Sequence, residues 1–174
     1  HSHVNKTAAK ANSTLGFICK NILTKSQEVK KAAYQQLVRP VLEYASCAWE
    51  SAADSATNRL KAVQRRAARM ICGVRRTDHK TSTTGLLQKL DIPTLAKRQQ
   101  DRCLKVFSQY HHTNSGVLNN YIKPASHTSA RRHPHQYFLH QSNTDHHRRS
   151  FFIRTAKQWN ALPPDSLLLN PPSV

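Results

Sequence analysis

The sequence predicts an all-α fold, and two observations carry the prediction. Apolar residues recur at steps of three and four through the first 110 of 174 residues, and residues that start or stop helices lie at the ends of these stretches. The periodicity fades from about 111 to 149 and returns at Ser150. We therefore expect a small helical bundle over 1–110, a long irregular His/Arg-rich segment over 111–149, and a short helix with a tail over 150–174 that docks back onto the bundle.

Five helices are expected in the first part, near residues 3–24, 26–38, 41–49, 54–72 and 93–110. Ser26 is suited to cap the second helix. Pro40 lacks a backbone donor, so this helix should stop or kink near Arg39, while Pro40 can open the next one. Gly73 supplies the stop for the fourth helix, a short helical turn follows around 86–90, and Pro93 opens the fifth.

The helix expected over 54–72 has one apolar face and one cationic face. Its inner stripe is Ala56, Leu60, Val63, Ala67, Met70 and Ile71. At about 100° per residue, five cations share the far side: Arg59, Lys61, Arg65, Arg66 and Arg69. Such a face usually only meets water. No acid stands among these cations between residues 59 and 69, so we predict that the face contacts phosphates. Arginine pairs beside ordered segments could add contacts: Arg75 and Arg76, Arg131 and Arg132, Arg148 and Arg149.

The charge balance points to a polyanionic partner. There are 27 Lys and Arg against 9 Asp and Glu, a net charge of +18, so nucleic acid is the first partner to consider and an anionic membrane surface the second. No stretch approaches the roughly 20 apolar residues of a spanning helix, and no signal-peptide core opens the chain. The start at His1 suggests a fragment or a processed product. We expect an intracellular protein, nuclear or cytoplasmic and not secreted.

The scattered acids argue against catalysis by this chain. No two of the nine are adjacent or separated by one residue, whereas two-metal polymerases and nucleases need clustered carboxylates. The four glycines are isolated, so no phosphate-binding loop is present. We predict no catalytic residue, no metal site and no cofactor. The four cysteines are spread singly and are expected to be reduced and buried: Cys19, Cys47, Cys72 and Cys103.

Eight of the 11 histidines lie between residues 111 and 149. Three close pairs there could each offer two nitrogens to zinc, but no Cys-x-x-Cys pair accompanies them. The favoured interpretation is a polar, His-rich loop, with a brief strand over 137–139. These side chains could instead add positive charge below about pH 6.5.

Aromatic residues offer little basis for contact with nucleic-acid bases. Four of them are expected in the core rather than in stacking platforms: Tyr44, Trp49, Phe107 and Trp159. Gln64 is the only side chain of the 54–72 helix with a base-reading amide, and it lies near the apolar stripe. We therefore expect the chain to contact the phosphate backbone of a nucleic acid and not to read its base sequence.

Three blocks of the sequence resemble one family. They are residues 34–45 (YQQLVRPVLEYA) with Trp49, residues 63–69 (VQRRAAR), and residues 150–155 (SFFIRT) with Trp159-Asn160 and Leu162-Pro163. In this order and spacing they are similar to the region after the polymerase palm of jockey-like non-LTR (LINE) retrotransposon reverse transcriptases. Residues 6–11 (KTAAKA) with Leu15-Gly16-Phe17 also fit, and the resemblance covers about 3–169.

The resemblance implies a multidomain RNA-directed DNA polymerase with an endonuclease, fingers and palm, and then a helical thumb that holds the template–primer duplex. The catalytic aspartates and their magnesium would belong to the upstream palm, and this chain would contact RNA, DNA or a hybrid through phosphates. An alternative is a genomic remnant or a protein-interaction scaffold without a nucleic-acid role. A sequence-specific DNA reader and a membrane-surface binder are weaker alternatives.

Overall fold

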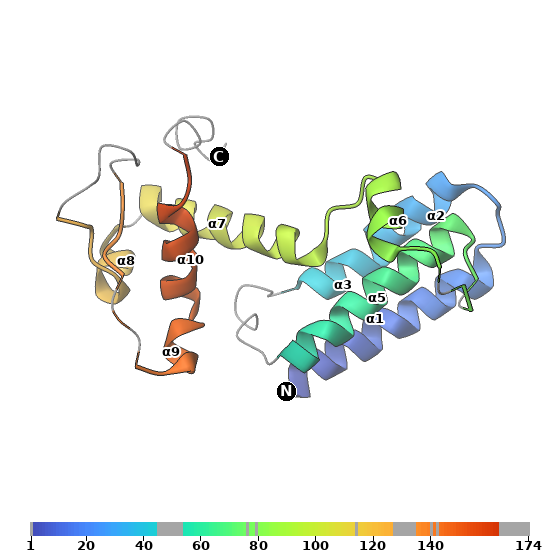
Figure 1. The fold of residues 1–174 in the computed structure, drawn as a ribbon, viewed down its shortest axis with the longest axis horizontal. Helices are drawn as coiled ribbons and strands as arrows, with labels where there is room; N and C mark the ends of the chain where they lie inside the picture. Colours follow the sequence, from blue (N-terminus) through green and yellow to red (C-terminus); the bar gives the residue numbers. More distant parts are fainter. Residues whose placement is uncertain are drawn as a thin grey trace. The chain divides into compact units, whose positions relative to one another are not determined.

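A computed structural model describes residues 2–44, 54–75, 77–78, 80–113, 115–126, 135–139, 141 and 143–163. Its helices are α1 (Ser2–Asn21), α2 (Gln27–Ala33), the π-helix η1 (Tyr34–Val38), α3 (Arg39–Glu43), α5 (Asp54–Cys72), α6 (Thr83–Lys89), α7 (Leu95–Thr113), α8 (Ser115–Tyr121), α9 (Asp145–Arg148) and α10 (Phe151–Asn160) (Figure 1). These residues form no strand, so the all-α prediction is confirmed. The chain divides into two compact units, unit 1 (His1–Gln99) and unit 2 (Gln100–Val174).

Cap residues set several helix ends. Ser26 accepts a hydrogen bond from the N–H of Val29 at 3.4 Å, as predicted for the cap of α2. Gly73 has φ +67°, and the N–H of Val74 donates to the carbonyl of Arg69, which closes α5 in a Schellman motif at the predicted residue. α7 begins at Leu95 and not at Pro93, because the Thr94 hydroxyl caps it by accepting from the N–H of Lys97.

The helix was predicted to stop or kink near Arg39. A stop there is wrong, because the chain stays helical from η1 into α3. The N–H of Arg39 donates to the carbonyl of Tyr34, five residues earlier, and this wider π-turn leads into α3. A wider turn is suited to this place, since the ring of Pro40 would crowd the carbonyl four residues before it in a regular α-helix. Pro40 stands in the first turn of α3, as predicted for the opening of the third helix. Residues 45–49 of the expected 41–49 helix lie outside the described residues.

The segment predicted to be irregular contains more helix than expected. α7 continues to Thr113, and both α8 and α9 fall between 111 and 149. Leu118 and Ile122 are fully buried four residues apart, which is the apolar spacing that supports α8. The strand expected over 137–139 is only an isolated antiparallel bridge between Pro124 and Tyr137.

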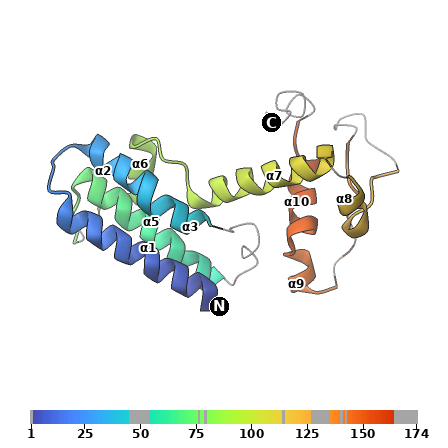
Figure 2. The ribbon, with the colours of Figure 1, turned by 180° about the vertical axis from the view of Figure 1, so that it is seen from behind.

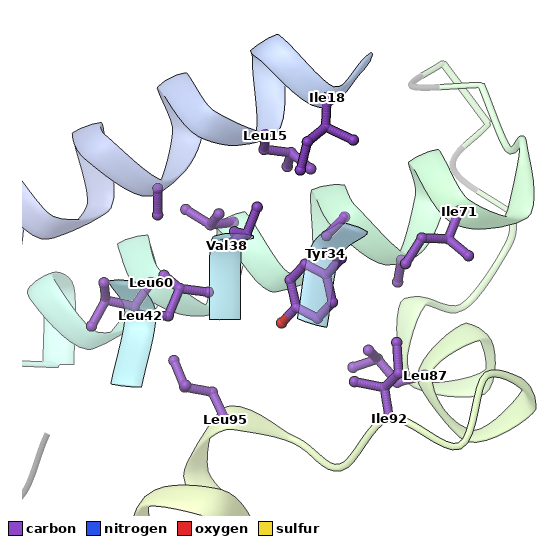
Figure 3. Packing of buried hydrophobic residues seen from close by; sticks show 14 of the residues in the cluster. Leu15, Ile18, Tyr34, Val38, Leu42, Leu60, Ile71, Leu87, Ile92 and Leu95 are labelled. Carbon is purple, nitrogen blue, oxygen red and sulfur yellow. The ribbon is translucent and has the colours of Figure 1, made fainter. Parts of the chain in front are cut away.

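In unit 1, α1 packs beside α5 in both views (Figures 1 and 2). The core between these helices, α3, η1 and α6 is aliphatic except for Tyr34. Figure 3 shows Leu15 and Ile18 of α1 near Val38 and Tyr34. Each large side chain buried here contributes about 2 kcal/mol, so these stripes fix the pairing of α1 with α5.

Two polar bridges tie this core to the start of α7. Gln64 is 4% exposed, donates to the carbonyl of Pro93 at 2.9 Å, and accepts from the N–H of Leu95 at 2.9 Å. Glu43 is also buried, and its carboxylate accepts from Arg98 through Nε and, at 3.1 Å, through Nη2. Burial raises the pKa of the Tyr34 hydroxyl to about 12. The buried amide of Gln64 and the buried carboxylate of Glu43 are therefore both paired within unit 1.

The core of unit 2 contains three aromatic rings beside four aliphatic side chains. The ring of Phe107 lies 5.3 Å from that of Tyr137 and 5.3 Å from that of Trp159. Trp159 donates Nε1–H to the carbonyl of His135 at 2.8 Å, and the Asn160 side chain bonds both backbone groups of Tyr137. The amide of Asn160 thus makes the two hydrogen bonds to the Tyr137 backbone that a neighbouring strand would make. The prediction that Phe107 and Trp159 are core residues is confirmed.

Candidate nucleic-acid interface

The two faces of α5 are separated as the sequence predicted. Leu60, Val63 and Ala67 are at most 1% exposed, in the core of unit 1. On the other side, Arg59, Lys61, Arg65 and Arg66 are exposed, and Arg69 is half-buried. The apolar stripe fixes the rotation of the helix and so presents the cations together.

Asparagines of α1 hold two of these arginines. Arg59 donates from Nη1 to Asn5 Oδ1 at 3.0 Å, and Arg66 donates from Nη1 to Asn12 Oδ1 at 3.3 Å. Asn5 and Asn12 are seven residues apart on α1. Their partners Arg59 and Arg66 are also seven residues apart on α5, so the two helices run in the same direction. A guanidinium has five N–H donors, so each arginine keeps donors for a phosphate while one bond orients it.

Arg69 has a different role from the other arginines. Its Nη1 donates to the carbonyls of Asp78 at 2.7 Å and Arg75 at 3.2 Å. The guanidinium therefore ties α5 to the loop that follows it, and fewer of its donors face outward. Its charge still contributes to the potential of the surface.

Asp78 shapes the same loop from within. Its Oδ1 accepts from the N–H of Lys80 at 2.9 Å, and its Oδ2 accepts from the hydroxyl of Thr81. The Thr81 hydrogen bond lowers the pKa of the Asp78 carboxyl. The Asp78 carboxylate is thus turned onto its own loop. Arg75 is exposed on this loop, whereas Arg76 lies outside the described residues.

A groove of about 790 Å³ lies along the seam of α1 and α5, and we call it the α1–α5 groove. It is lined by Asn12, Cys19, Ala62, Arg65, Arg66, Arg69, Met70, Val74 and Thr83. Three arginines and no acid belong to this lining. Charges within the Debye length of about 10 Å at 0.1 M salt act together on a ligand, so the groove favours a polyanion.

The structure brings some predicted residues together and leaves others apart. Arg65, Arg66 and Arg69 share the groove, while Arg59 and Lys61 lie on α5 outside its lining. Lys61 and Arg65 make no hydrogen bond or ion pair with the residues that the structure describes. Away from the groove, Arg148 pairs with Asp145, and Arg131 and Arg132 lie outside the described residues.

Sequence reasoning missed the asparagines of α1 and misplaced one cysteine. The matching seven-residue steps of Asn5 to Asn12 and of Arg59 to Arg66 are the signal that could have found the seam. Cys19 was expected to be buried, but it is exposed and lines the groove, because it follows the buried Ile18 by one residue on α1. Cys103 is buried as predicted, Cys72 is half-buried, and Cys47 lies outside the described residues.

Tyr44 is exposed, whereas Gln64, whose amide could read a base, is buried. Tyr44 was expected in the core but is 71% exposed, because α3 ends at Glu43 and the Tyr44 backbone turns to ψ 125°. Gln64 is buried and both ends of its amide are bonded, so it is not presented for base readout. Trp49 lies outside the described residues.

Within the described ranges, no group of three or more His, Cys, Asp or Glu side chains could hold a metal ion. His111 hydrogen-bonds the Tyr137 hydroxyl through Nδ1 at 2.7 Å. Over the same part of the chain, no helix is long and apolar enough to cross a membrane.

Comparison with known proteins found no significant match, either to a protein-family model, to a curated protein or to a solved structure.

Proposed function

We propose that this chain is a non-catalytic segment that grips nucleic acid by its phosphate backbone, with the α1–α5 groove as the contact surface. The observation that supports this proposal is that Arg65, Arg66 and Arg69 line the groove and that no acid does. Arg66 is already oriented by Asn12, so less side-chain entropy is lost when it meets a phosphate. The phosphate backbone is the expected ligand because the groove lining offers three arginines, and its one amide side chain, Asn12, already accepts a hydrogen bond from Arg66.

We further propose that the segment is the thumb and post-palm region of a non-LTR retrotransposon reverse transcriptase. This rests on the sequence blocks at 34–45, 63–69 and 150–155, and on the helical character of the chain. The template–primer duplex would then lie against α5, and catalysis with its magnesium would belong to a palm upstream. On this proposal the protein works inside the cell, in the nucleus or cytoplasm, with RNA, DNA or their hybrid as partner.

The test is the salt dependence of binding to an RNA–DNA hybrid. If about five phosphates are neutralised, log K should fall against log salt with a slope near −4.5. Hybrids of unrelated base sequence should give the same affinity and the same slope. Failure of micromolar hybrid to bind at low salt would contradict the proposal and would favour a remnant or a protein-interaction scaffold.

A further inference from the structure

A second groove lies in unit 1, on another side of α1. It has a volume of about 440 Å³ and is bordered by His3, Lys6 and Lys10 of α1, by Pro40 and Val41 of α3, and by Tyr44. We call it the α1–α3 groove. At about 100° per residue, Lys6 and Lys10 are about 120° and 160° from Asn12 around α1, so the two grooves are separate surfaces.

The lining of this groove combines two kinds of chemistry. Pro40, Val41 and the largely exposed ring of Tyr44 form an apolar wall. Lys6 and Lys10 are exposed one helical turn apart on the opposite helix, and no acid lines the groove. A ligand that satisfies both sides has a flat apolar part and more than one negative charge. The volume falls in the range of about 300–1,000 Å³ that is usual for small-ligand sites.

We propose that the α1–α3 groove holds an unpaired nucleotide of a single-stranded nucleic acid. Its base stacks on Tyr44 beside Pro40, and neighbouring phosphates of the strand meet Lys6 and Lys10. A strand fits better than an acidic peptide, because it carries a phosphate on both sides of each base and every base offers a face for stacking. The inference rests on the proposed function only in taking nucleic acid as the ligand, since the site and the group recognised are different.

The experiment compares two strands with the full chain. One is a thymidine strand of about 12 nucleotides, and the other is an abasic strand of the same length and phosphate count. The wild-type protein should bind the base-bearing strand more tightly. Tyr44→Ala should reduce this preference about fivefold or more, which is the effect of losing one stacked base. Tyr44→Phe keeps the ring and should retain the preference. Unchanged thermal melting of both variants shows that the fold is intact.

Lysine variants complete the test. Lys6→Gln with Lys10→Gln should weaken both strands and make the salt slope shallower by about 1.4, at about 0.7 for each phosphate of a single strand. Equal wild-type affinity for the two strands would overturn the inference and leave phosphate gripping intact. A preference that survives Tyr44→Ala would also overturn it. Binding of neither strand, and of no hybrid, would overturn both proposals.

Discussion

The two units carry their positive charge in different forms. Unit 1 has 18 Lys and Arg against 6 Asp and Glu, a net charge of +12, and only three histidines. Unit 2 has 9 against 3, a net charge of +6, and eight histidines. Lys and Arg stay charged across the physiological range, whereas imidazoles change charge between about pH 5 and 8. Unit 1 therefore carries twice the formal charge of unit 2, and unit 2 carries most of the imidazoles.

The hydrophobic cores of the two units also differ in composition. Unit 1 is held by aliphatic stripes shared among several helices, and unit 2 by the buried rings of Phe107, Tyr137 and Trp159 with four aliphatic side chains. A core made of few large side chains loses more when one of them is removed. The proposed contact surface for phosphates and the larger of the two cores therefore belong to the same unit.

The largest effect is expected from Trp159→Ala. It removes the ring against Phe107 and the bond to the His135 carbonyl, and should cost about 3–5 kcal/mol of the unfolding free energy of unit 2. Trp159→Phe keeps a ring and should cost less, about 1.5 kcal/mol. Amide hydrogen exchange should show lost protection in unit 2 only. Equal loss in unit 1 would contradict the separation of the two cores.

Gln64→Leu should destabilise unit 1 by about 2–3 kcal/mol. The substitution leaves the N–H of Leu95 and the carbonyl of Pro93 without their partner in a buried place. Urea unfolding measures the change. Gln88→Leu, at an exposed position of α6, is the matched control and should change stability by less than about 0.5 kcal/mol. Similar effects of both variants would show that the Gln64 bridge is not a structural tie.

Alkaline pH should destabilise unit 1 through Tyr34. Its pKa is raised from 10.0 to about 12 in the folded protein, so the unfolded chain loses this proton first. The stabilising contribution is complete below about pH 10 and is lost as the pH rises toward 12, by about 3 kcal/mol in all. Tyr34→Phe should flatten the urea-unfolding free energy over that range, and Tyr110→Phe, at an exposed position, should not. A slope unchanged by Tyr34→Phe would contradict this cause.

The smallest effect is expected from Asp91→Gly. Asp91 has φ +49° at the end of α6, where the N–H of Ile92 donates to the carbonyl of Leu87 in a second Schellman motif. Glycine removes the Cβ strain of this conformation but loosens the unfolded chain. We expect a net gain of about 0.5 kcal/mol in urea unfolding of unit 1. A loss of stability would show that the carboxylate itself supports the turn.

The sequence predicted α5 well because its information is local. The apolar stripe repeats over 19 residues and Gly73 supplies the left-handed stop, so neither depends on distant partners. The role of Arg69 could not be predicted in this way, since its acceptors are backbone carbonyls whose positions depend on the path of a loop. The short helices of unit 2 were missed because a seven-residue helix gains most of its stability from tertiary burial, here of Leu118.

The sequence predicted which residues of α5 form the cationic face, but it did not predict which residues they contact. The helical angle placed Arg65 and Arg66 on one face, but it could not show that α1 runs beside them in the same direction and offers Asn12. Tyr44 was misplaced because a tyrosine at helical spacing was expected to continue the stripe, whereas the backbone leaves the helix at that residue.

The most direct test of the central claim removes charge at two places in unit 1. Arg65→Gln with Arg66→Gln changes the α1–α5 groove, and Lys25→Gln with Lys89→Gln removes two exposed cations that do not line it. Arg69 stays, because its loss would release the loop at 75–81. With an RNA–DNA hybrid, we predict that the groove variant makes the salt slope shallower by about 1.8 and that the control changes it much less. Equal changes in the two variants, with unaltered melting, would contradict the assignment of phosphate contact to this groove.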